Sequence, residues 1–440
     1  MAKKKQIELT IEEKLQNALV PKEEQPYKIP SNWCWLYSNF VVDVRDGTHD
    51  TPKYISEGYP LITSKNLKNN NIDFDKVNYI SKEDYEKINL RSKVDIGDVL
   101  FSMIGTIGNP VLIKGQTNYA IKNVALFKDI NLINMTFFRF YLETKFVIDK
   151  MKKEAKGSTQ KFVSLKYLRN FPICYPSLEE QQRIVNRIEF LFAKLDRAKE
   201  LIENTLAQFE QNKMAILHKA FTGELTAKWR KKQKIIKKNT WQLVNIKTVS
   251  NKIFAGGDVP KDNMSIEKTD EFKVPIYTNG EKNNGLYGYT NEIKVKDDAI
   301  TISARGTIGY TVIRKAPFYP AIRLITIIPN IEKINIGFLY YVFNFFKVDS
   351  AGSSIPQLTV PMVKDYNFEL PTIEEQQEIV NILDKLLAKY NKIKNLEQQL
   401  EKIELLKKAI LAKAFRGELG TNNPDEESAE NLLKEILAEK

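Results

Sequence analysis

Hydrophobic and polar positions follow two different patterns along this chain. Residues 26–175 and 235–370 contain short apolar runs, such as YPLIT, DVLFSMI, VPIYT and AITISA, separated by Gly, Asn, Asp and Pro. Runs of this kind are typical of β-strands joined by turns. Each region also contains an aromatic-rich segment that predicts a helix, MTFFRFYLETKFVIDKM in the first and IGFLYYVFNFF in the second. The pattern therefore predicts two compact α/β modules.

The segment that follows each module has a helical period. Apolar residues recur there in steps of three and four, at Ile184, Ile188, Leu191 and Leu195, and again at Ile379, Leu383, Leu386 and Tyr390. This spacing is typical of a coiled-coil seam. Ser177 with Glu180, and Thr372 with Glu375, match the S/T-x-x-E capping box that opens a helix. We expect two long helices that pair antiparallel as a stiff strut.

The two halves of the chain repeat one another. PSLEEQQRIVNRI, beginning at Pro176, returns as PTIEEQQEIVNIL at Pro371, and 11 of 21 positions are identical between 176–196 and 371–391. AILHKAFTGELT returns as AILAKAFRGELG, which predicts that the helices end near Gly223 and Gly417. GTIG occurs in both modules, and GSTQKF precedes the first helix as GSSIPQL precedes the second. Two copies predict internal pseudo-two-fold symmetry.

Charge points to a polyanionic partner. The chain of 440 residues carries a net charge of +12, and nucleic acid is the first candidate for such an excess. The basic run Lys228–Lys238 is either a solvated linker or a phosphate contact, and the two readings remain open. No run of 18 apolar residues and no secretory signal occur, and the two cysteines form no disulfide framework. These features favour a reducing cytoplasm.

Motifs for catalysis are missing from the sequence. No G-x-x-x-x-G-K-[ST] phosphate loop, H-E-x-x-H motif or paired C-x-x-C occurs, and no NPPY-type loop is present for gripping a flipped base. His218 lies late on the first predicted helix, where packing or exposure is the simpler interpretation. FAGGDV, around Gly256, reads as a turn. Together these observations favour a binding protein that holds no metal or cofactor of its own.

The doubled motifs resemble those of the specificity subunit of type I restriction–modification systems. The resemblance is carried by P-x-x-E-E-Q-Q-x-I-V and KAF-x-GEL, each present twice, by GSTQ and GSSIPQ, and by IPSNWCW, RDGTHDTPKY and YPLITSKN in the first half. It covers the chain from about Leu15 to the C-terminal segment.

The resemblance implies a fold class, α+β, with two target-recognition domains separated by two long antiparallel helices. Each domain would read one half of a bipartite, asymmetric DNA site. The helices would dock two modification subunits, which carry S-adenosylmethionine and methylate adenine. A restriction subunit that uses ATP and Mg²⁺ would join the same assembly. The specificity chain itself would catalyse nothing.

On this interpretation the chain divides into six parts. They are an N-terminal helical segment (1–25), target-recognition domain 1 (26–175), a central helix with basic linker (176–234), target-recognition domain 2 (235–370), a distal helix (371–420) and an acidic C-terminal tail (421–440). A helix from Ser177 to Gly223 would be about 70 Å long at 1.5 Å per residue. Half-sites one turn apart need only about 34–36 Å, so either the modules lean over the helices or the helix is broken.

Candidate DNA contacts lie in the loops of both modules. Arginine can bond guanine through two hydrogen bonds, while most lysines contact phosphate and supply affinity. We expect contacts from Arg45, Thr48, His49, Lys53, Ser64, Lys65, Asn66, Lys68, Gln160 and Lys161 in the first module, and from Thr278, Asn279, Lys282, Arg305, Ser353 and Gln357 in the second. The first GTIG follows Met103 and Ile104, so the role of Arg305 does not transfer to it.

Two other functions stay open at this point. The chain could be a fused restriction–methylation enzyme or a lone nuclease, although the motifs for either are missing. It could also be a coiled-coil scaffold that does not bind DNA. Methyl transfer by the purified chain would favour the first alternative. DNA binding that does not change with salt would remove the nucleic-acid interpretation.

Overall fold

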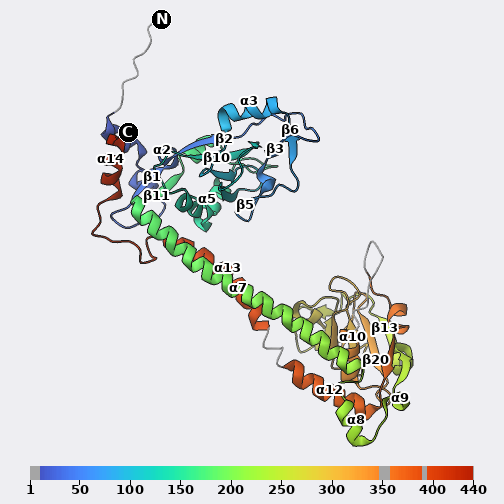
Figure 1. Ribbon diagram of the computed structural model, residues 1–440. Coiled ribbons are helices and arrows are strands. Elements are labelled where there is room, and N and C mark those ends of the chain that lie inside the picture. Colours follow the sequence, from blue (N-terminus) through green and yellow to red (C-terminus); the bar gives the residue numbers. More distant parts are fainter. Residues whose placement is uncertain (1–9, 346–356, 389–393, 440) are drawn as a thin grey trace. The chain divides into compact units, whose positions relative to one another are not determined.

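The computed structural model describes residues 10–345, 357–388 and 394–439. The chain divides into two compact units (Figure 1). Unit 1 comprises Met1–Leu201 and Gln399–Lys440, and unit 2 comprises Ile202–Gln398. Each unit therefore combines one module with parts of both long helices.

Unit 1 is built from short helices and small sheets. Its helices are α1 (Ile11–Ala18), α2 (Ser38–Val41), α3 (Lys82–Ser92), α4 (Met135–Glu143), α5 (Lys145–Glu154), α6 (Leu165–Arg169) and α14 (Ala429–Glu439). Its strands are β1 (Cys34–Tyr37), β2 (Val42–Asp46), β3 (Tyr59–Ile62), β4 (Leu67–Lys68), β5 (Asn71–Ile72), β6 (Asn78–Ile80), β7 (Val99–Ser102), β8 (Gly108–Leu112), β9 (Ala120–Ile121), β10 (Val124–Asp129) and β11 (Pro172–Tyr175).

Unit 2 repeats this plan. Its helices are α8 (Ala227–Gln233), α9 (Lys237–Thr240), α10 (Ile336–Phe345), α11 (Val360–Lys364) and α12 (Ile373–Ala388). Its strands are β12 (Gln242–Asn245), β13 (Ser250–Ala255), β14 (Met264–Ser265), β15 (Val274–Tyr277), β16 (Leu286–Thr290), β17 (Ala299–Ile302), β18 (Thr311–Arg314), β19 (Tyr319–Pro320), β20 (Ile325–Pro329) and β21 (Asn367–Leu370). Two helices, α7 (Leu178–Phe221) and α13 (Lys394–Ala414), contribute residues to both units.

The main sheets of the two units have the same topology, with the order β2-β10-β7-β8 in unit 1 and β13-β20-β17-β18 in unit 2. The second sheet differs in size: it is β6-β3-β9 in unit 1 and β14-β16-β15-β19 in unit 2. A parallel pair follows in each, β3 with β9 and β15 with β19, and an antiparallel pair joins the two ends of each module, β1 with β11 and β12 with β21. The repeat seen in the sequence is thus a repeat of the fold.

The prediction of long helices is confirmed. Helix α7 runs through 44 residues without a break, and α12 and α13 make up the second copy on either side of residues 389–393. In unit 1, Lys407 pairs with Asp196 at 2.5 Å and Lys199 with Glu404 at 3.5 Å. As residue numbers rise on α7 they fall on α13, so the two helices run antiparallel there.

Both helix ends have the predicted glycine. Gly223 and Gly417 take φ angles of +79° and +75°, the left-handed conformation that glycine adopts at little cost. The KAF motif just before each glycine places an aromatic ring inside a unit. Phe415 packs 4.9 Å from Phe137 between ring centroids in unit 1, and Phe221 packs 5.5 Å from Phe338 in unit 2.

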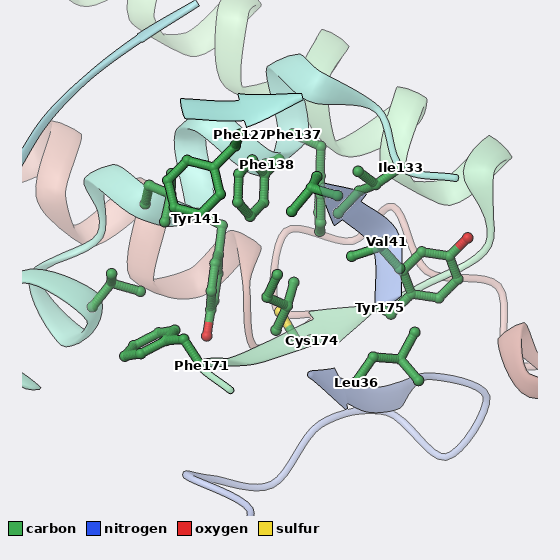
Figure 2. Packing of buried hydrophobic residues seen from close by; sticks show 14 of the residues in the cluster. Leu36, Val41, Phe127, Ile133, Phe137, Phe138, Tyr141, Phe171, Cys174 and Tyr175 are labelled. Atoms are coloured by element: carbon green, nitrogen blue, oxygen red, sulfur yellow. The ribbon is translucent and has the colours of Figure 1, made fainter. Parts of the chain in front are cut away.

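The core of unit 1 gathers around the aromatic helix α4. Figure 2 shows Phe137, Phe138 and Tyr141 in one cluster with Phe127 and Cys174, all of which are buried. Each fully buried phenylalanine contributes about 1.5–3 kcal/mol relative to an exposed one. Ile184 and Ile188 of α7 belong to the same core, so the start of the long helix is part of the folded module.

The QQ pair of the repeat makes the same hydrogen bonds in both units. In unit 1, Gln181 Oε1 accepts from the backbone N–H of Asn134 at 2.8 Å, and Gln182 Oε1 accepts from Asn134 Nδ2 at 2.9 Å. Asn134 is the N-cap of α4. The doubled glutamines therefore join the long helix to the helix that carries the aromatic core.

The capping boxes are only half as predicted. Ser177 and Thr372 accept from the backbone N–H groups of Glu180 and Glu375, as N-caps do. The two glutamate side chains instead accept hydrogen bonds from other side chains. Glu180 accepts from the Thr421 hydroxyl at 2.6 Å and from Arg183, while its burial raises its pKa.

The C-terminal segment is folded, where the sequence suggested an acidic tail. Helix α14 packs on α1, with Ala429 and Leu433 buried in the core of unit 1 beside Leu15. The many acidic residues between the apolar positions of this segment made it look like a solvent-exposed tail in the sequence. The basic run in unit 2 also forms structure, α8 and α9, in which Arg230 is buried and the neighbouring lysines Lys228, Lys231 and Lys232 are exposed.

Candidate nucleic-acid interface

Three loops of unit 1 that lie far apart in the sequence meet at one surface. They are residues 46–53 after β2, the turn 103–108 between β7 and β8, and residues 157–163 before α6. The Gly105 N–H donates to the Lys161 carbonyl at 2.8 Å, and the Val163 N–H donates to the Met103 carbonyl at 3.0 Å. An open pocket of about 410 Å³ lies between them, lined by Asp46, His49, Ile104, Gln160 and Phe162 among others.

His49 has a fixed orientation at the rim of this pocket. Its Nε2 lies 2.9 Å from an oxygen of Asp46, and its Nδ1 lies 2.8 Å from Asn123 Oδ1. Asp46 is buried and also pairs with Arg91. The His49 side chain is still 60% exposed, although both ring nitrogens lie within hydrogen-bond distance of partners in unit 1.

The other residues predicted in this loop have different surroundings. Arg45 lies on β2, pairs with Asp43 at 2.7 Å and donates to the carbonyl of Arg91, which ties it to the sheet. The Thr48 hydroxyl accepts from the N–H of Asp50 and shapes the turn. Lys53 is exposed.

Asn66, predicted to contact DNA, is an internal residue of its loop. It is 6% exposed, its Oδ1 accepts from the N–H and hydroxyl of Thr63, and its Nδ2 donates to the Asp73 carbonyl at 3.0 Å. Both ends of the amide are therefore used to hold the turn. A short polar side chain in a turn often bonds its own backbone in this way, which is why the residue type alone was misleading.

The neighbours of Asn66 remain accessible. Ser64 is half-buried and donates to the Asn123 carbonyl at 3.3 Å. The side chain of Asn123 also lies beside His49, so both residues contact Asn123. Lys65 is exposed. Lys68 is exposed too, but it pairs with Asp73 at 2.8 Å, and this hydrogen bond lowers the pKa of Asp73.

Unit 2 brings the corresponding loops together around Arg305. The Arg305 side chain is exposed and its Nη2 donates to Gln357 Oε1 at 3.0 Å. The next residue, Leu358, donates its N–H to the Ala304 carbonyl, as Val163 does to Met103 in unit 1. The glutamine-bearing loop thus lies against the GTIG turn in both units.

The remaining predicted residues of unit 2 lie beside this turn. Asn279 Oδ1 accepts from the Ala304 N–H at 2.8 Å and its Nδ2 donates to the Ile322 carbonyl, so Asn279 supports the turn. Thr278 is half-buried, and Lys282 is exposed on a short 3₁₀ helix (Lys282–Gly285). Ser353 lies outside the described residues.

The sequence analysis missed a loop of unit 2 at 256–262. The Gly256 N–H donates to the Leu324 carbonyl, as the Gly47 N–H donates to that of Val124. A Cβ at Gly256 would lie 2.5 Å from the Pro320 carbonyl oxygen, and one at Gly47 would lie 2.2 Å from that of Ile121, so neither position accepts a side chain. FAGGDV is a turn, as predicted, but it is also the counterpart of RDGTHDTPK.

This second loop adds two candidate contacts. Asp258 and Lys261 are exposed and correspond to Asp50 and Lys53. The signal in the sequence was GTHDTPK against GGDVPK, in which Gly, Asp, Pro and Lys recur with one residue deleted. The deletion removes the counterpart of His49.

A family model for the type I restriction modification DNA specificity domain matches residues 47–210 and, a second time, 238–405. The chain belongs to this family of type I DNA specificity subunits. Its function is DNA sequence recognition within a type I restriction–modification system.

Relatives of the specificity family match along much of the chain. The chain is 23% identical to the StySPI specificity subunit of Salmonella potsdam, covering 94% of this chain and 96% of that protein. It is 30% identical to the EcoBI specificity subunit of Escherichia coli over 46% of this chain and 44% of that one. A solved chain from a study of complex assembly and conformational transition in a type I restriction–modification system has a similar fold, with a TM-score of 0.68, 18% identity and coverage of 89% and 100%.

The seam predicted for the specificity subunit's helices lies mostly inside the two units. Ile184 and Ile188 are fully buried in unit 1, and Ile379 and Leu383 in unit 2, whereas Leu191, Leu195 and Leu386 are half-buried. These residues therefore attach each helix to its own module. Tyr390 lies outside the described residues.

Two general findings concern the described ranges as a whole. No group of three or more His, Cys, Asp or Glu side chains there has the arrangement of a metal site. Within the same ranges, every helix is too short or too polar to cross a membrane.

Proposed function

We propose that each unit reads one half of a bipartite, asymmetric DNA site. One observation carries the proposal: the same strand topology presents unlike side chains at equivalent points. Ile104 and Arg305 both precede GTIG, and His49 has no counterpart in the shorter loop at Gly256. A shared fold accounts for two similar approaches to a duplex, and different contact residues account for two different half-sites.

Side chains at the two surfaces would make different kinds of contact, some with bases and some with phosphates. Arg305 and Gln357 in unit 2, and His49 and Gln160 in unit 1, are the proposed base contacts, because they are accessible and lie where loops from different parts of the chain meet. The exposed lysines would contact phosphate; they are Lys53, Lys65, Lys161, Lys261 and Lys282. Arg45, Thr48, Ser64, Asn66, Lys68, Thr278 and Asn279 would hold the loops in shape.

The chemistry would come from partners. Two modification subunits would supply S-adenosylmethionine and adenine methylation, and a restriction subunit would supply ATP- and Mg²⁺-dependent cleavage. The exposed apolar side chains on the long helices support docking there: Phe190 is 50% exposed on α7, and Leu405 and Leu406 are 63% and 50% exposed on α13. Large exposed apolar side chains of this kind are ones that a docked protein would cover.

Mapping methylated adenines across the genome of a host that carries this chain and its modification subunit tests the proposal. We expect methylation at one bipartite sequence whose two halves differ. Methyl transfer by the purified chain alone would instead support an enzyme. A plot of log K for duplex DNA against log salt that stays flat would support a scaffold that does not bind DNA.

A further inference from the structure

We propose that the paired glutamines Gln181–Gln182 and Gln376–Gln377 are positioning residues that set the spacing between the two DNA half-sites. The proposal rests on the function proposed above. It concerns the joint between each recognition domain and the first turn of its long helix, and that joint lies inside one unit in each case.

The joint of unit 1 consists of two hydrogen bonds from Asn134 to the glutamines, and each glutamine is held in turn by a second bond to a residue of its own segment. Gln181 Oε1 accepts from the Asn134 N–H at 2.8 Å, and Gln181 Nε2 donates to the Pro176 carbonyl at 2.9 Å. Gln182 Oε1 accepts from Asn134 Nδ2 at 2.9 Å, and Gln182 Nε2 donates to Asn186 Oδ1 at 2.8 Å. Both amides are therefore anchored to α7 at one end and to Asn134 at the other.

Asn134 also caps the N-terminus of α4. Its Oδ1 accepts from the N–H groups of Thr136 and Phe137 at 2.9 and 3.1 Å, which caps the helix. Helix α4 carries Phe137, Phe138 and Tyr141 into the core. A displacement of Asn134 would displace the domain's main aromatic helix, so the glutamines fix the recognition domain relative to the axis of α7.

The joint of unit 2 repeats these contacts with the corresponding residues, and Gln376 Nε2 also donates to the Lys333 carbonyl at 3.2 Å. Gln376 accepts from the Asn335 N–H at 2.7 Å and donates to the Pro371 carbonyl at 2.9 Å. Gln377 accepts from Asn335 Nδ2 at 2.8 Å and donates to Asn381 at 3.0 Å. Asn335 accepts from the N–H groups of Gly337 and Phe338. Two recognition domains with different loops are thus attached through one geometry.

Burial separates the roles of the two glutamines. Gln181 and Gln376 are fully buried, so losing their hydrogen bonds would weaken folding as well as position. Gln182 and Gln377 are exposed, and a lost bond there has little effect on folding. The outer pair therefore gives a way to loosen the joint while the domain stays folded.

Spacing is the property that such a joint would control. One added base pair moves a half-site by about 3.4 Å and rotates it by roughly 35° around the duplex. A domain held by these bonds and by the core that it shares with Ile184 and Ile188 would strain to follow that change, whereas a loosened domain would tilt toward it. Half-site sequence would be unaffected, because the hydrogen-bond partners of the glutamines lie outside the loops that contain Arg305 and His49.

The test compares methylation maps from hosts that carry wild-type chain or the double variants Gln182→Ala/Gln377→Ala and Gln181→Ala/Gln376→Ala, each with the modification subunit. A genome contains the half-sites at every spacing. We expect wild type to methylate one spacing, and the variants to add sites one base pair longer or shorter, with discrimination reduced about fivefold to tenfold. The half-site sequences should stay unchanged.

A matched control replaces exposed glutamines further along the repeated segments, Gln208→Ala on α7 with Gln398→Ala on α13, and should keep the single spacing. Restoring Gln182 and Gln377 in the outer double variant should restore discrimination between spacings. If the outer variant methylates only the original spacing, the positioning role is wrong, whatever the buried variant does. If wild type itself has no bipartite site, the proposed function fails instead.

Discussion

Trp241 donates its indole N–H to the buried carboxylate of Glu375 at 2.9 Å, across 134 residues of sequence. Trp241 directly precedes the first strand of the second module, and Glu375 lies in the first turn of the helix that follows its last strand. The same carboxylate accepts from the Thr226 hydroxyl at 2.7 Å and from Arg230, which caps the end of α7 through the Gly223 carbonyl. One glutamate thus joins three segments of unit 2.

Replacing Glu375 with alanine should destabilise the protein severely. The change leaves Arg230 buried without its carboxylate, and such a loss costs about 3–5 kcal/mol. Urea unfolding followed by circular dichroism measures it. Glu374→Ala, at the exposed neighbouring position, is the matched control and should change the free energy of unfolding by less than about 0.5 kcal/mol. Equal losses of stability in the two variants would contradict the role of Glu375 as the buried partner of Arg230.

Glu180 should make stability depend on pH in an unusual direction. Burial raises its pKa, partly opposed by the Thr421 hydroxyl and Arg183. A carboxyl with a raised pKa binds its proton more tightly in the folded state than in the unfolded state. Its contribution to stability is therefore full below the ordinary glutamate pKa of about 4.3 and is lost as the pH rises through the raised value.

Comparing wild type with Glu180→Gln isolates this effect. The free energy of unfolding of both proteins is measured at pH 5 and at pH 7. We expect wild type to be more stable relative to the variant at pH 5 than at pH 7. Glu179→Gln, which alters an exposed carboxylate next to it, should show a smaller change between the two pH values. A difference between wild type and Glu180→Gln that does not move with pH would argue against a raised pKa.

Arg305→Ala should weaken DNA recognition at one half-site only. A lost bidentate contact to a base costs about 1–3 kcal/mol and relaxes specificity at that position. The measurement is binding of the chain with its modification subunit to duplexes in which each half-site is varied in turn. The half-site read by unit 1 serves as internal control. An equal loss for all sequences would make Arg305 a phosphate contact.

A fragment of residues 1–235 should form a dimer. In the full chain, unit 1 is completed by the end of α13, where Phe415 packs on Phe137 and Tyr141. The fragment lacks that segment but retains its repeat, AILHKAFTGEL, with Phe221 in the place of Phe415. A second copy could therefore supply the missing helix end, and the dimer would recognise a symmetric, doubled half-site.

Sedimentation of the fragment measures this association. Phe221→Ala should weaken it, since removing a buried phenylalanine costs about 3–5 kcal/mol at each site. His218→Ala is the comparison, because His218 is exposed on the same turn of helix. A fragment that stays monomeric at the concentrations used to assemble the complex would refute the proposal that a second copy supplies the missing helix end.

Much of the fold could be predicted from local patterns. The spacing of Ile184 and Ile188 predicted a helix, the glycines at 223 and 417 predicted its end, and the doubled motifs predicted two like modules. Each of these signals involves residues within a few turns of one another. The surroundings of the candidate residues needed the structure: His49 lies where three loops meet, Arg305 lies against Gln357, and Asn66 is buried inside its turn.

The sequence by itself determined that this is a protein of two repeated modules with long helices, because periodicity, turn residues and repeated motifs are properties of short stretches. Tertiary structure decided what those stretches attach to. Only folding brings Gln181 to Asn134 and Glu375 to Trp241, and only folding matches the loop at Gly256 with that at Gly47. The physical reason is that a buried side chain's role depends on its hydrogen-bond partners, and those partners come from segments that the sequence places far away.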